Sequence, residues 1–416
     1  MKIINFGSCN IDYVYSVDHI VVPGETEMTY NFETFPGGKG LNQSVAAAKA
    51  GAKIYHAGCI GNDGAMLRDI LSQSGADVSY LKELDIKNGH AIIQVSESGE
   101  NSIFLHRGSN SMITEEYVDE VLKDFSRGDI LLVQNEINNV DYIIESAYRK
   151  GMEVALNPAP FDEKLKELDI NMLSYLILNE VEAKGFTGKE EPEEFIAYMR
   201  KMYPKLKVVF TLGKKGCIYA DKEQMSYHSA FKVKTVDTTA AGDTFIGYFL
   251  CAVSEGKTTS EAIKLACAAS ALTVSKKGAA PSIPYADEVC EALKTLETYS
   301  DDTKEKKTSE QLCREIKEYV DGNIRTARLG ELAKKLGYSE TYTGMLIKKV
   351  MNESFSRILQ ERRCVFAAKL LVTTDLSVGE IINKIGYENE SFFRRNFKEM
   401  YGKTPNQYRK TTEKSM

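Results

Sequence analysis

Residues 237–245 read DTTAAGDTF and lead into an apolar stretch at 245–253 that predicts a helix. Small residues let the backbone approach a ligand closely, and the first N–H groups of a helix have no partner within it. Together with the positive end of the helix dipole, these groups form a site for phosphate. Asp243 is out of place in a site that only binds an anion. It fits a base that takes a proton from a hydroxyl attacking the phosphate.

The composition bounds the class of protein. A chain of 416 residues predicts two domains rather than one core. No apolar run reaches 18 residues, so no membrane span is predicted, and the first residues lack the basic and apolar pattern of a signal peptide. The eight cysteines contain no C-x-x-C pair, which favours reduced thiols in a cytoplasmic protein. The five histidines are isolated, which argues against a histidine metal site.

Charge is divided unevenly along the chain. From residue 304 onward there are 23 Lys and Arg against 15 Asp and Glu, whereas the first 303 residues hold 30 basic and 44 acidic residues. An acidic body followed by a basic region predicts that the later region meets nucleic acid.

Residues 1–297 alternate short β-rich runs with helical patterns. This alternation predicts an α/β domain with a mostly parallel sheet and helices on both faces. Strands that extend off the main sheet, near 10–40 and 88–108, predict a small β lid. The main strands are expected at 2–9, 54–59, 130–134, 153–157, 175–178, 208–211 and 217–220.

The rest of the chain is polar at first and then wholly helical. Residues 298–310 have almost nothing to bury and predict a linker before a domain at 311–416. LGELAKKLGY at 329–338 returns as VGEIINKIGY at 378–387, each an amphipathic helix ending in Gly-Tyr before a polar turn and a second helix. This repeat predicts two helix-turn-helix units in an all-α domain.

Polar residues gather at the predicted carboxyl ends of strands, where ligands of parallel sheets bind. NID at 10–12 suits hydrogen bonding to sugar hydroxyls, and PGGKGLNQ at 36–43 offers Lys39 and Asn42. The second motif lacks the spacing of a Walker phosphate loop, and a simple glycine turn before a helix remains an alternative. Each polar residue taken singly is also explained as a helix cap.

The ordered motifs NID, PGGKGLNQ, LNPAP, NEVEA, TLGKKG, DTTAAGDTF and KKGAAPSIP resemble the PfkB carbohydrate kinases, most closely the ribokinase branch. The resemblance covers about residues 1–297 and implies ATP-dependent phosphorylation of a sugar's primary hydroxyl. It makes Asp243 the catalytic base and the N–H groups of 240–243 an anion hole, formed by Ala240, Ala241, Gly242 and Asp243. The sugar contacts it implies are Asn10, Asp12, Gly38, Lys39, Asn42, Glu136 and Asp243.

The same resemblance implies the sites for nucleotide and cations. ATP is expected against Asn179, Glu182, Thr211, Gly213, Gly216, Gly242 and Cys267, with Asn179 and Glu182 organising Mg²⁺ and phosphates. A monovalent cation, K⁺, is expected at Asp237, Thr239, Thr273, Lys276, Gly278 and Ser282. The lid of this family often forms a dimer contact, which predicts a homodimer. Two departures from the family's pattern leave the identity of the sugar undecided. Cys267 replaces a common histidine, and Ile-Asn rather than Ser-Pro follows Glu136.

The segment SFFRRNFKEMYGKTPNQYR at 391–409, with the doubled Gly-Tyr units, resembles the AraC/XylS-type DNA-binding domain over about 310–410. This resemblance implies seven helices, with a long helix joining two units that face the major groove of double-stranded DNA. Phe393 and Phe397 are expected in the core. The alternatives are a basic solvated face and a helical interaction module. The DNA contacts expected are Thr341, Lys348, Lys349, Ser391, Arg394, Arg395 and Lys398.

Two functions from different classes follow. The first is a working sugar kinase, with ribose ahead of another pentose, a ketohexose or a nucleoside, fused to a DNA-binding regulator. The second is a transcription factor whose kinase fold binds sugar or nucleotide without turnover. Asp243 separates them, because a sensor has no need of a base within an anion hole.

Overall fold

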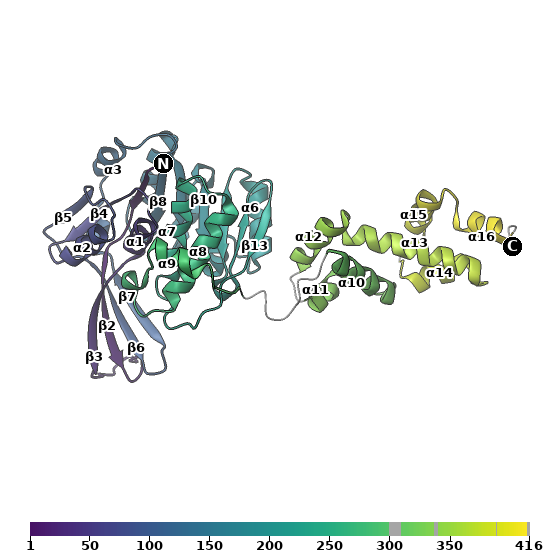
Figure 1. The fold of residues 1–416 in the computed structure, drawn as a ribbon, viewed down its shortest axis with the longest axis horizontal. Coiled ribbons are helices and arrows are strands. Elements are labelled where there is room, and N and C mark those ends of the chain that lie inside the picture. Colours follow the sequence, from purple (N-terminus) through teal and green to yellow (C-terminus); the bar gives the residue numbers. More distant parts are fainter. Residues whose placement is uncertain (299–308, 337–339, 388, 414–416) are drawn as a thin grey trace. The chain divides into compact units, whose positions relative to one another are not determined.

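The computed structural model describes residues 1–298, 309–336, 340–387 and 389–413 (Figure 1). Contacts between Cα atoms divide the chain into two compact units, Met1–Asp302 and Thr303–Met416. Most of the expected linker, 298–310, lies outside the described residues. Each unit is described by itself.

The first unit is built on a nine-stranded sheet with the order β13-β12-β11-β10-β9-β8-β1-β4-β5. Its strands from β11 to β5 are parallel, and β12 and β13 are antiparallel to their neighbours. The expected strand at 2–9 is shorter, because the chain turns away after Phe6. The strands are β1 Ile3–Phe6, β4 Ile54–Gly61, β5 Leu81–Leu84, β8 Ile130–Gln134, β9 Glu153–Asn157, β10 Tyr175–Leu178, β11 Lys207–Thr211, β12 Cys217–Ala220 and β13 Met225–His228.

Helices cover both faces of this sheet, as expected for buried parallel strands. Successive residues of a strand serve opposite cores: Ile130 and Leu132 pack with one set of helices, and Leu131 and Val133 with the other. The first set is α1 Lys39–Lys49, α2 Ala65–Gln73, α7 Ala241–Ser254, α8 Thr259–Val274 and α9 Ala286–Ala292. The second set is α3 Glu115–Leu122, α4 Val140–Arg149, α5 Glu180–Thr187 and α6 Pro192–Met202. Short 3₁₀ helices are η1 Gly108–Ser111, η2 Glu163–Glu167, η3 Ile170–Met172, η4 Gly213–Lys215 and η5 Ala280–Ser282.

Helices α1 and α7 are in close contact at Gly247. A Cβ atom there would lie 2.5 Å from Ala46 Cβ and 2.6 Å from Ala47 N. Only glycine allows this approach, which brings the first turns of both helices together above the sheet.

A second sheet of four strands, ordered β3-β2-β6-β7, extends away from the main sheet (Figure 1). Its strands are β2 Asn10–Val17, β3 Asn31–Gly37, β6 Gly89–Ser96 and β7 Asn101–His106. Asn10 and Asp12 therefore belong to a lid strand of their own rather than to the end of the first strand. The alternation of side chains along β2 places Asn10 and Asp12 on one face of the small sheet.

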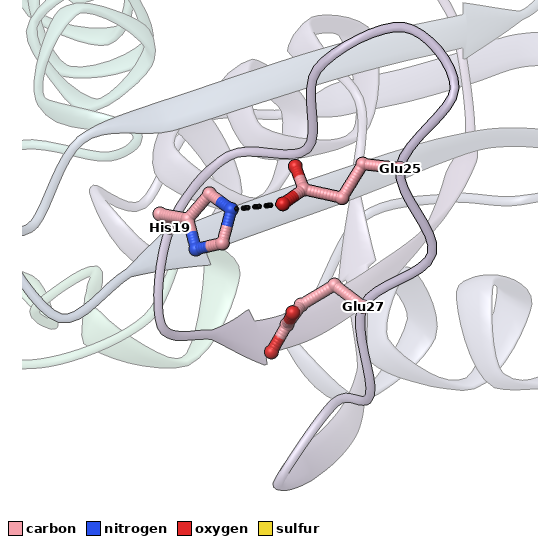
Figure 2. A group of neighbouring side chains, drawn as sticks. All are labelled: His19, Glu25 and Glu27. Atoms are coloured by element: carbon pink, nitrogen blue, oxygen red, sulfur yellow. Dashed lines mark hydrogen bonds and ion pairs between the residues drawn. The ribbon is translucent and has the colours of Figure 1, made fainter.

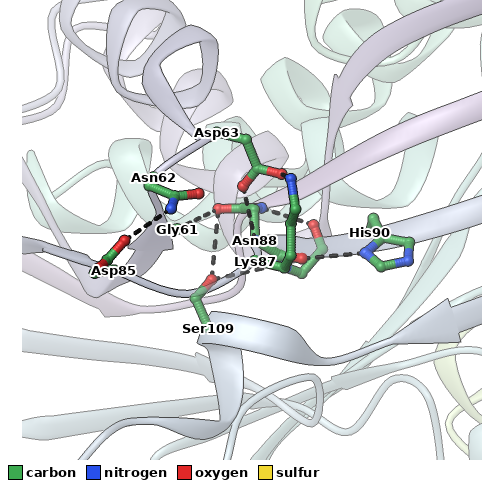
Figure 3. Close-up of polar contacts among 9 residues, drawn as sticks. Gly61, Asn62, Asp63, Asp85, Lys87, Asn88, His90 and Ser109 are labelled. Atoms are coloured by element: carbon green, nitrogen blue, oxygen red, sulfur yellow. Dashed lines mark hydrogen bonds and ion pairs between the residues drawn. The ribbon is translucent and has the colours of Figure 1, made fainter.

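Asn88 anchors the small sheet where it leaves the main one (Figure 3). This side chain is 1% exposed; its Oδ1 accepts from Gly61 N at 2.8 Å, and its Nδ2 donates to Cys9 O at 2.8 Å. Asp63 Oδ1 accepts from Asn88 N at 2.8 Å. These bonds join the end of β4, the residue before β2 and the start of β6 at one buried side chain.

The second unit is all-α, with seven helices in the residues described and two cores. Helix α13 joins the cores: Phe355 and Ile358 pack in the first, and Cys364 and Leu371 in the second. Phe393 and Phe397 are fully buried, as the sequence predicts. The helices are α10 Ser309–Gly322, α11 Leu329–Leu336, α12 Glu340–Met351, α13 Phe355–Thr373, α14 Val378–Ile385, α15 Glu390–Tyr401 and α16 Pro405–Glu413. Across the described residues, no helix has both the length and the apolar character needed to cross a membrane.

Candidate active site and nucleic-acid interface

The strand order reverses between β1 and β8, and open α/β sheets bind ligands at such a point. Here Ser8 Oγ donates to Glu136 Oε2 at 2.5 Å, which links the segments that follow these two strands. The same Glu136 oxygen accepts from Lys39 N at 3.0 Å, at the start of α1. The crevice therefore has a buried carboxylate between two strands and a helix.

Asp243 lies in the first turn of α7 and is 8% exposed. Asn42 Nδ2 donates to Asp243 Oδ2 at 3.0 Å, and Gln43 Nε2 donates to Asp243 Oδ1 at 2.9 Å. Both donors come from the first two turns of α1, so the α1–α7 contact fixes the orientation of this carboxylate. Asn42 Oδ1 is buried and has no hydrogen-bond partner in the described part of the protein.

The start of α7 leaves donors facing open space. Ala240 has left-handed backbone angles, φ 59° and ψ 5°, an uncommon conformation for a residue with a Cβ atom. Ala241 N donates to Thr238 O at 3.3 Å, and the next N–H groups, of Gly242 and Asp243, have no acceptor within the helix. A Cβ atom at Gly242 would meet no atom within 4 Å, so the backbone there borders a void. This combination forms an anion site with Asp243 beside it.

The residues expected to hold a sugar lie on the lid side of this crevice. Asn10 is 3% exposed, and its Oδ1 accepts from Asn110 Nδ2 at 2.7 Å. Asp12 folds over Gly37, where a Cβ atom would lie 2.0 Å from Asp12 Oδ2. Gly38 precedes α1 with a φ of 95°.

The charged residues of the crevice shift one another's pKa values. The pKa of Asp12 is raised to about 7, mainly because the carboxyl group is buried and also because Glu136 is nearby. Burial also raises the pKa of Glu136, against the opposing effect of Lys39. The charge of Asp243, more than that of Glu136, raises the pKa of Lys39 despite its burial. Lys39 is therefore a retained positive charge among three carboxyl groups.

A cavity of about 390 Å³ lies beside the start of α7. Gly216, with φ 101°, forms part of its wall, and a Cβ atom there would lie 1.9 Å from His228 O. Phe231, another residue of the wall, pairs antiparallel with Thr298, and Lys232 N donates to Glu297 O at 2.7 Å. The cavity is lined by Asn179, Glu180, Thr211, Gly213, Lys214, Gly216, Ala230, Phe231, Val233, Thr235, Thr238, Ala241, Gly242, Phe245, Cys267, Ser270, Ala271 and Val274.

A second cavity of about 230 Å³ contains Lys39 and Asp243 and adjoins the first. The two share wall residues at the start of α7 and at the ends of β10 and β11: Asn179, Thr211, Thr238, Ala241 and Gly242. The larger cavity thus leads along Gly242 to the Asp243 carboxylate.

Asn179 and Glu182 form a capping box at the start of α5. Asn179 Oδ1 accepts from Glu182 N at 3.2 Å, and Glu182 Oε2 accepts from Asn179 N at 2.7 Å. Burial raises the pKa of Glu182. The expectation that a strand-end residue is a helix cap is therefore correct for this pair, which also lines the smaller cavity.

Of the residues expected at a monovalent cation, Thr239 and Gly278 contact Asp237. Its Oδ1 accepts from Thr239 N at 2.9 Å and its Oδ2 from Gly278 N at 3.0 Å. Thr273 Oγ1 is buried and bonded to Ala269 O at 3.0 Å. Ser282 Oγ donates to Ala279 O at 2.7 Å. The Lys276 side chain instead pairs with Glu288 at 2.8 Å, so only its backbone carbonyl is a possible ligand.

In the described ranges, one group of histidine and acidic side chains brings its atoms close enough to share a metal ion (Figure 2). It consists of His19, Glu25 and Glu27 in the β2–β3 connection, and His19 Nε2 lies 2.8 Å from Glu25 Oε1. The histidine is exposed and the group lies outside the two cavities. No role is assigned to it.

In the second unit, α15 carries the expected basic residues. Arg394 is held by Glu390, with Nε at 2.8 Å and Nη2 at 2.6 Å from Glu390 Oε1. The guanidinium of Arg395 lies 5.2 Å from the centre of the Phe392 ring. Ser391, Lys398 and, on α12, Lys348 are exposed. The side chains of Thr341 and Lys349 lie outside the described residues.

Several residues of the crevice escaped the sequence analysis. Ser8, Gln43, Asn110 and Gln134 all have buried polar bonds here, and none was expected in the site. The available signal was an amide or hydroxyl within or next to an apolar strand or helix, because buried polar groups need partners.

The first unit matches the family described as pfkB family carbohydrate kinase over residues 1–286, and residues 332–411 match a helix-turn-helix domain. The ribokinase of Haemophilus influenzae is 39% identical over 69% of this chain and 96% of its own. The crystal structure of ribokinase from Thermotoga maritima is 35% identical, with a TM-score of 0.64 over 71% of this chain and 100% of its own. Ribokinase of Arabidopsis thaliana complexed with ribose and ATP is 28% identical, with a TM-score of 0.61 over 70% and 98%.

The chain therefore belongs to the pfkB family of carbohydrate kinases. Its first domain is a ribokinase-like, ATP-dependent carbohydrate kinase, and its second is an AraC-type helix-turn-helix domain that binds DNA.

Proposed function

We propose that this protein phosphorylates the primary hydroxyl of ribose with ATP, and that its second domain binds a specific DNA site to regulate transcription. One observation carries the enzymatic half: the buried Asp243 carboxylate lies beside the open N–H groups at the start of α7. The ribokinases similar to this chain, one of them solved with ribose and ATP, support ribose as the sugar.

In this proposal the sugar lies between the lid and α1. Asn10, Asp12, Gly38, Asn42 and Glu136 hold its hydroxyls, and the unpartnered Asn42 Oδ1 supplies a buried acceptor. Asp243 takes the proton of the reacting hydroxyl. The N–H groups of Ala240, Ala241, Gly242 and Asp243 stabilise the charge that develops on the transferring phosphoryl group, and Lys39 adds a positive charge.

We place ATP in the larger cavity. Its nucleoside part would lie against Thr211, Gly213, Gly216 and Cys267, and its phosphates would lie at Gly242. Asn179 and Glu182 would organise Mg²⁺. Their carboxylate and amide oxygens suit that ion, which binds through few protein groups and keeps its waters. The Mg²⁺ ion would supply neutralisation of phosphate charge. The capping box fixes both side chains at the edge of the smaller cavity.

K⁺ is proposed beside Asp237, with the hydroxyl oxygens of Thr239, Thr273 and Ser282, each of which donates its proton elsewhere, and the carbonyls of Lys276 and Gly278 as ligands. The loop around Asp237 runs directly into the start of α7. The cation would therefore hold the anion hole in position by fixing the backbone that precedes Ala240.

The DNA-binding half uses α12 and α15, the second helices of the two units, with Ser391, Arg394, Arg395, Lys398 and Lys348 toward the duplex. Thr341 and Lys349 are proposed on sequence alone. We propose in addition that two copies associate through the lid, whose β7 exposes Phe104 at 62% and Ile103 at 56%.

The enzymatic half is tested by ADP release with Mg²⁺, K⁺ and a panel of ribose, deoxyribose, ketohexoses and nucleosides. Turnover is expected to be highest with ribose. Asp243→Ala should lower it by about 10²-fold or more and leave the dissociation constant for ribose within a few-fold. No ADP release by the wild-type protein with any sugar would refute the proposal.

A further inference from the structure

Behind Asp243, buried carboxamides form a row along the carboxyl edge of the main sheet. Asn5, Gln134 and Asn157 come from β1, β8 and β9, which are neighbouring strands, and none is more than 6% exposed. Gln43 of α1 is fully buried above this row. Such a set of polar groups is stable only if each donor meets an acceptor.

The bonds of this row end at Asp243. Gln134 Nε2 donates to Asn5 Oδ1 at 3.0 Å and to Gln43 Oε1 at 2.7 Å. Gln43 Nε2 in turn donates to Asn157 Oδ1 at 3.0 Å and to Asp243 Oδ1 at 2.9 Å. Gln43 thus uses both amide atoms, and its donor faces the carboxylate.

Two backbone carbonyls fix the direction of the whole row. Asn5 Nδ2 donates to Gly40 O at 2.8 Å, and Asn157 Nδ2 donates to Ile177 O at 3.0 Å. A carbonyl oxygen only accepts, so each terminal amide must turn its own oxygen toward the middle. Gln134 must then give N–H to Asn5 and Gln43, which leaves Gln43 with its N–H group toward Asp243.

We infer that Gln43 is a positioning residue for phosphoryl transfer, an inference that rests on the proposed function. It holds Asp243 Oδ1 against the sheet, and Oδ2, which accepts one bond from Asn42 Nδ2, keeps a lone pair for the reacting hydroxyl. The hydroxyl oxygen bonds to the γ-phosphorus, its proton goes to Oδ2, and the bond to ADP breaks with its electron pair on ADP. Asn42 differs, because its free Oδ1 can meet the sugar.

Gln43→Glu and Gln43→Met test this role. The first puts a carboxylate against Asp243 Oδ1 and Asn157 Oδ1, and the second removes the amide and keeps the length. Both should lower kcat by about 10- to 100-fold with KM for ribose and ATP within threefold. Gln43→Glu should also move the acid limb of the kcat profile to higher pH. Gln73→Glu, the same change at an exposed position of α2, should change neither.

Gln134→Glu tests the direction of the row. A carboxylate there would draw Gln43 Nε2 toward itself and turn Gln43 Oε1 to Asp243. The same displacement of the acid limb is therefore expected from a residue that does not contact Asp243. A folded Gln43→Met with wild-type kcat, or a fall in kcat with both pH profiles unchanged, would overturn the inference.

A double-mutant cycle makes the test independent of turnover. Thermal unfolding of Gln43→Met, Asp243→Asn and the double variant should give non-additive changes, because the two side chains share a bond. Additive changes would count against the inference. Wild-type ADP release in the same assays decides the proposed function separately.

Discussion

Asn42 and Asp243 are 201 positions apart in the chain, and Asn42 Nδ2 donates to Asp243 Oδ2 at 3.0 Å. The bond depends on how closely α7 approaches α1, which Gly247 permits. The geometry of the proposed base is therefore set by the packing of two helices as much as by its own turn.

Gly247→Ala should lower both stability and activity. The added Cβ atom would lie 2.5 Å from Ala46 Cβ, so α7 must move away from α1. We expect a loss of about 1–3 kcal/mol in the free energy of unfolding, together with a lower kcat as Asn42 and Asp243 separate. Thermal unfolding and ADP release measure the two effects. Unchanged stability would show that the helices have room to adjust.

Gly242→Ala, five residues earlier in the same helix, should separate the two effects. Its Cβ atom meets nothing within 4 Å, so the helix should gain about 0.5–1 kcal/mol from reduced freedom of the unfolded chain. The methyl group would enter the space assigned to the phosphoryl group, and kcat should fall steeply. Gly379→Ala in α14, also without near neighbours, serves as the control and should leave kinase activity unchanged.

Sugar binding should depend on pH through Asp12. Its pKa of about 7 means that it is protonated at pH 6 and charged at pH 8. A charged carboxylate accepts more hydrogen bonds from hydroxyls, so the dissociation constant for ribose should fall as the pH rises through 7. Calorimetric titration at pH 6 and pH 8 measures this. Asp12→Asn should bind more weakly at pH 8 and show no such change.

The same pKa has a consequence for stability. A folded pKa above the ordinary value means that the folded state binds this proton more tightly than the unfolded chain does. The contribution of Asp12 is therefore complete below about pH 4 and is lost as the pH rises toward 7. As the pH rises from about 4 to 7, the free energy of unfolding of Asp12→Asn should therefore fall less than that of the wild type.

Glu390 should restrain DNA binding by holding Arg394. Glu390→Gln releases this arginine and removes a negative charge, so affinity should rise and the slope of log affinity against log salt should steepen by about one contact. Fluorescence anisotropy with a duplex selected from random DNA measures both. Arg395→Ala should weaken binding about 10- to 100-fold if the arginine reads a base. A salt-independent interaction would contradict duplex binding by α15.

Association through the lid should depend on the exposed side chains of β7. Phe104→Asp places a charge on this strand and should give a monomer in sedimentation analysis. Tyr148→Asp, at a side chain 50% exposed on α4, should leave the oligomeric state unchanged. Equal masses for wild type and Phe104→Asp would argue against the lid contact.

The sequence predicts secondary structure best where a single local pattern determines it. The strands expected at 130–134, 153–157 and 175–178 agree with β8, β9 and β10, because buried parallel strands are continuous apolar runs. The lid strands are predicted only as lying near 10–40 and 88–108, and the start of β2 is not, since NIDYVYSV follows β1 after only three residues.

The residues of the candidate site also differ in how far the local sequence predicts them. Asp243 stands out from its neighbours in sequence, whereas Gln43 and Gln134 acquire their partners only through the pairing of β8 with β1 and the packing of α1 on α7. No local pattern shows which amide meets a carboxylate 200 residues away.

Phe231, in the wall of the larger cavity, pairs with Thr298. Thr298 lies near the end of the first unit, so this pairing fixes that end of the unit to a wall of the cavity. The amide proton of Lys232, bonded to Glu297 O, is therefore a natural reporter. Its exchange with solvent, compared with and without ADP, would show whether nucleotide bound as proposed stabilises the pairing at the end of the first unit.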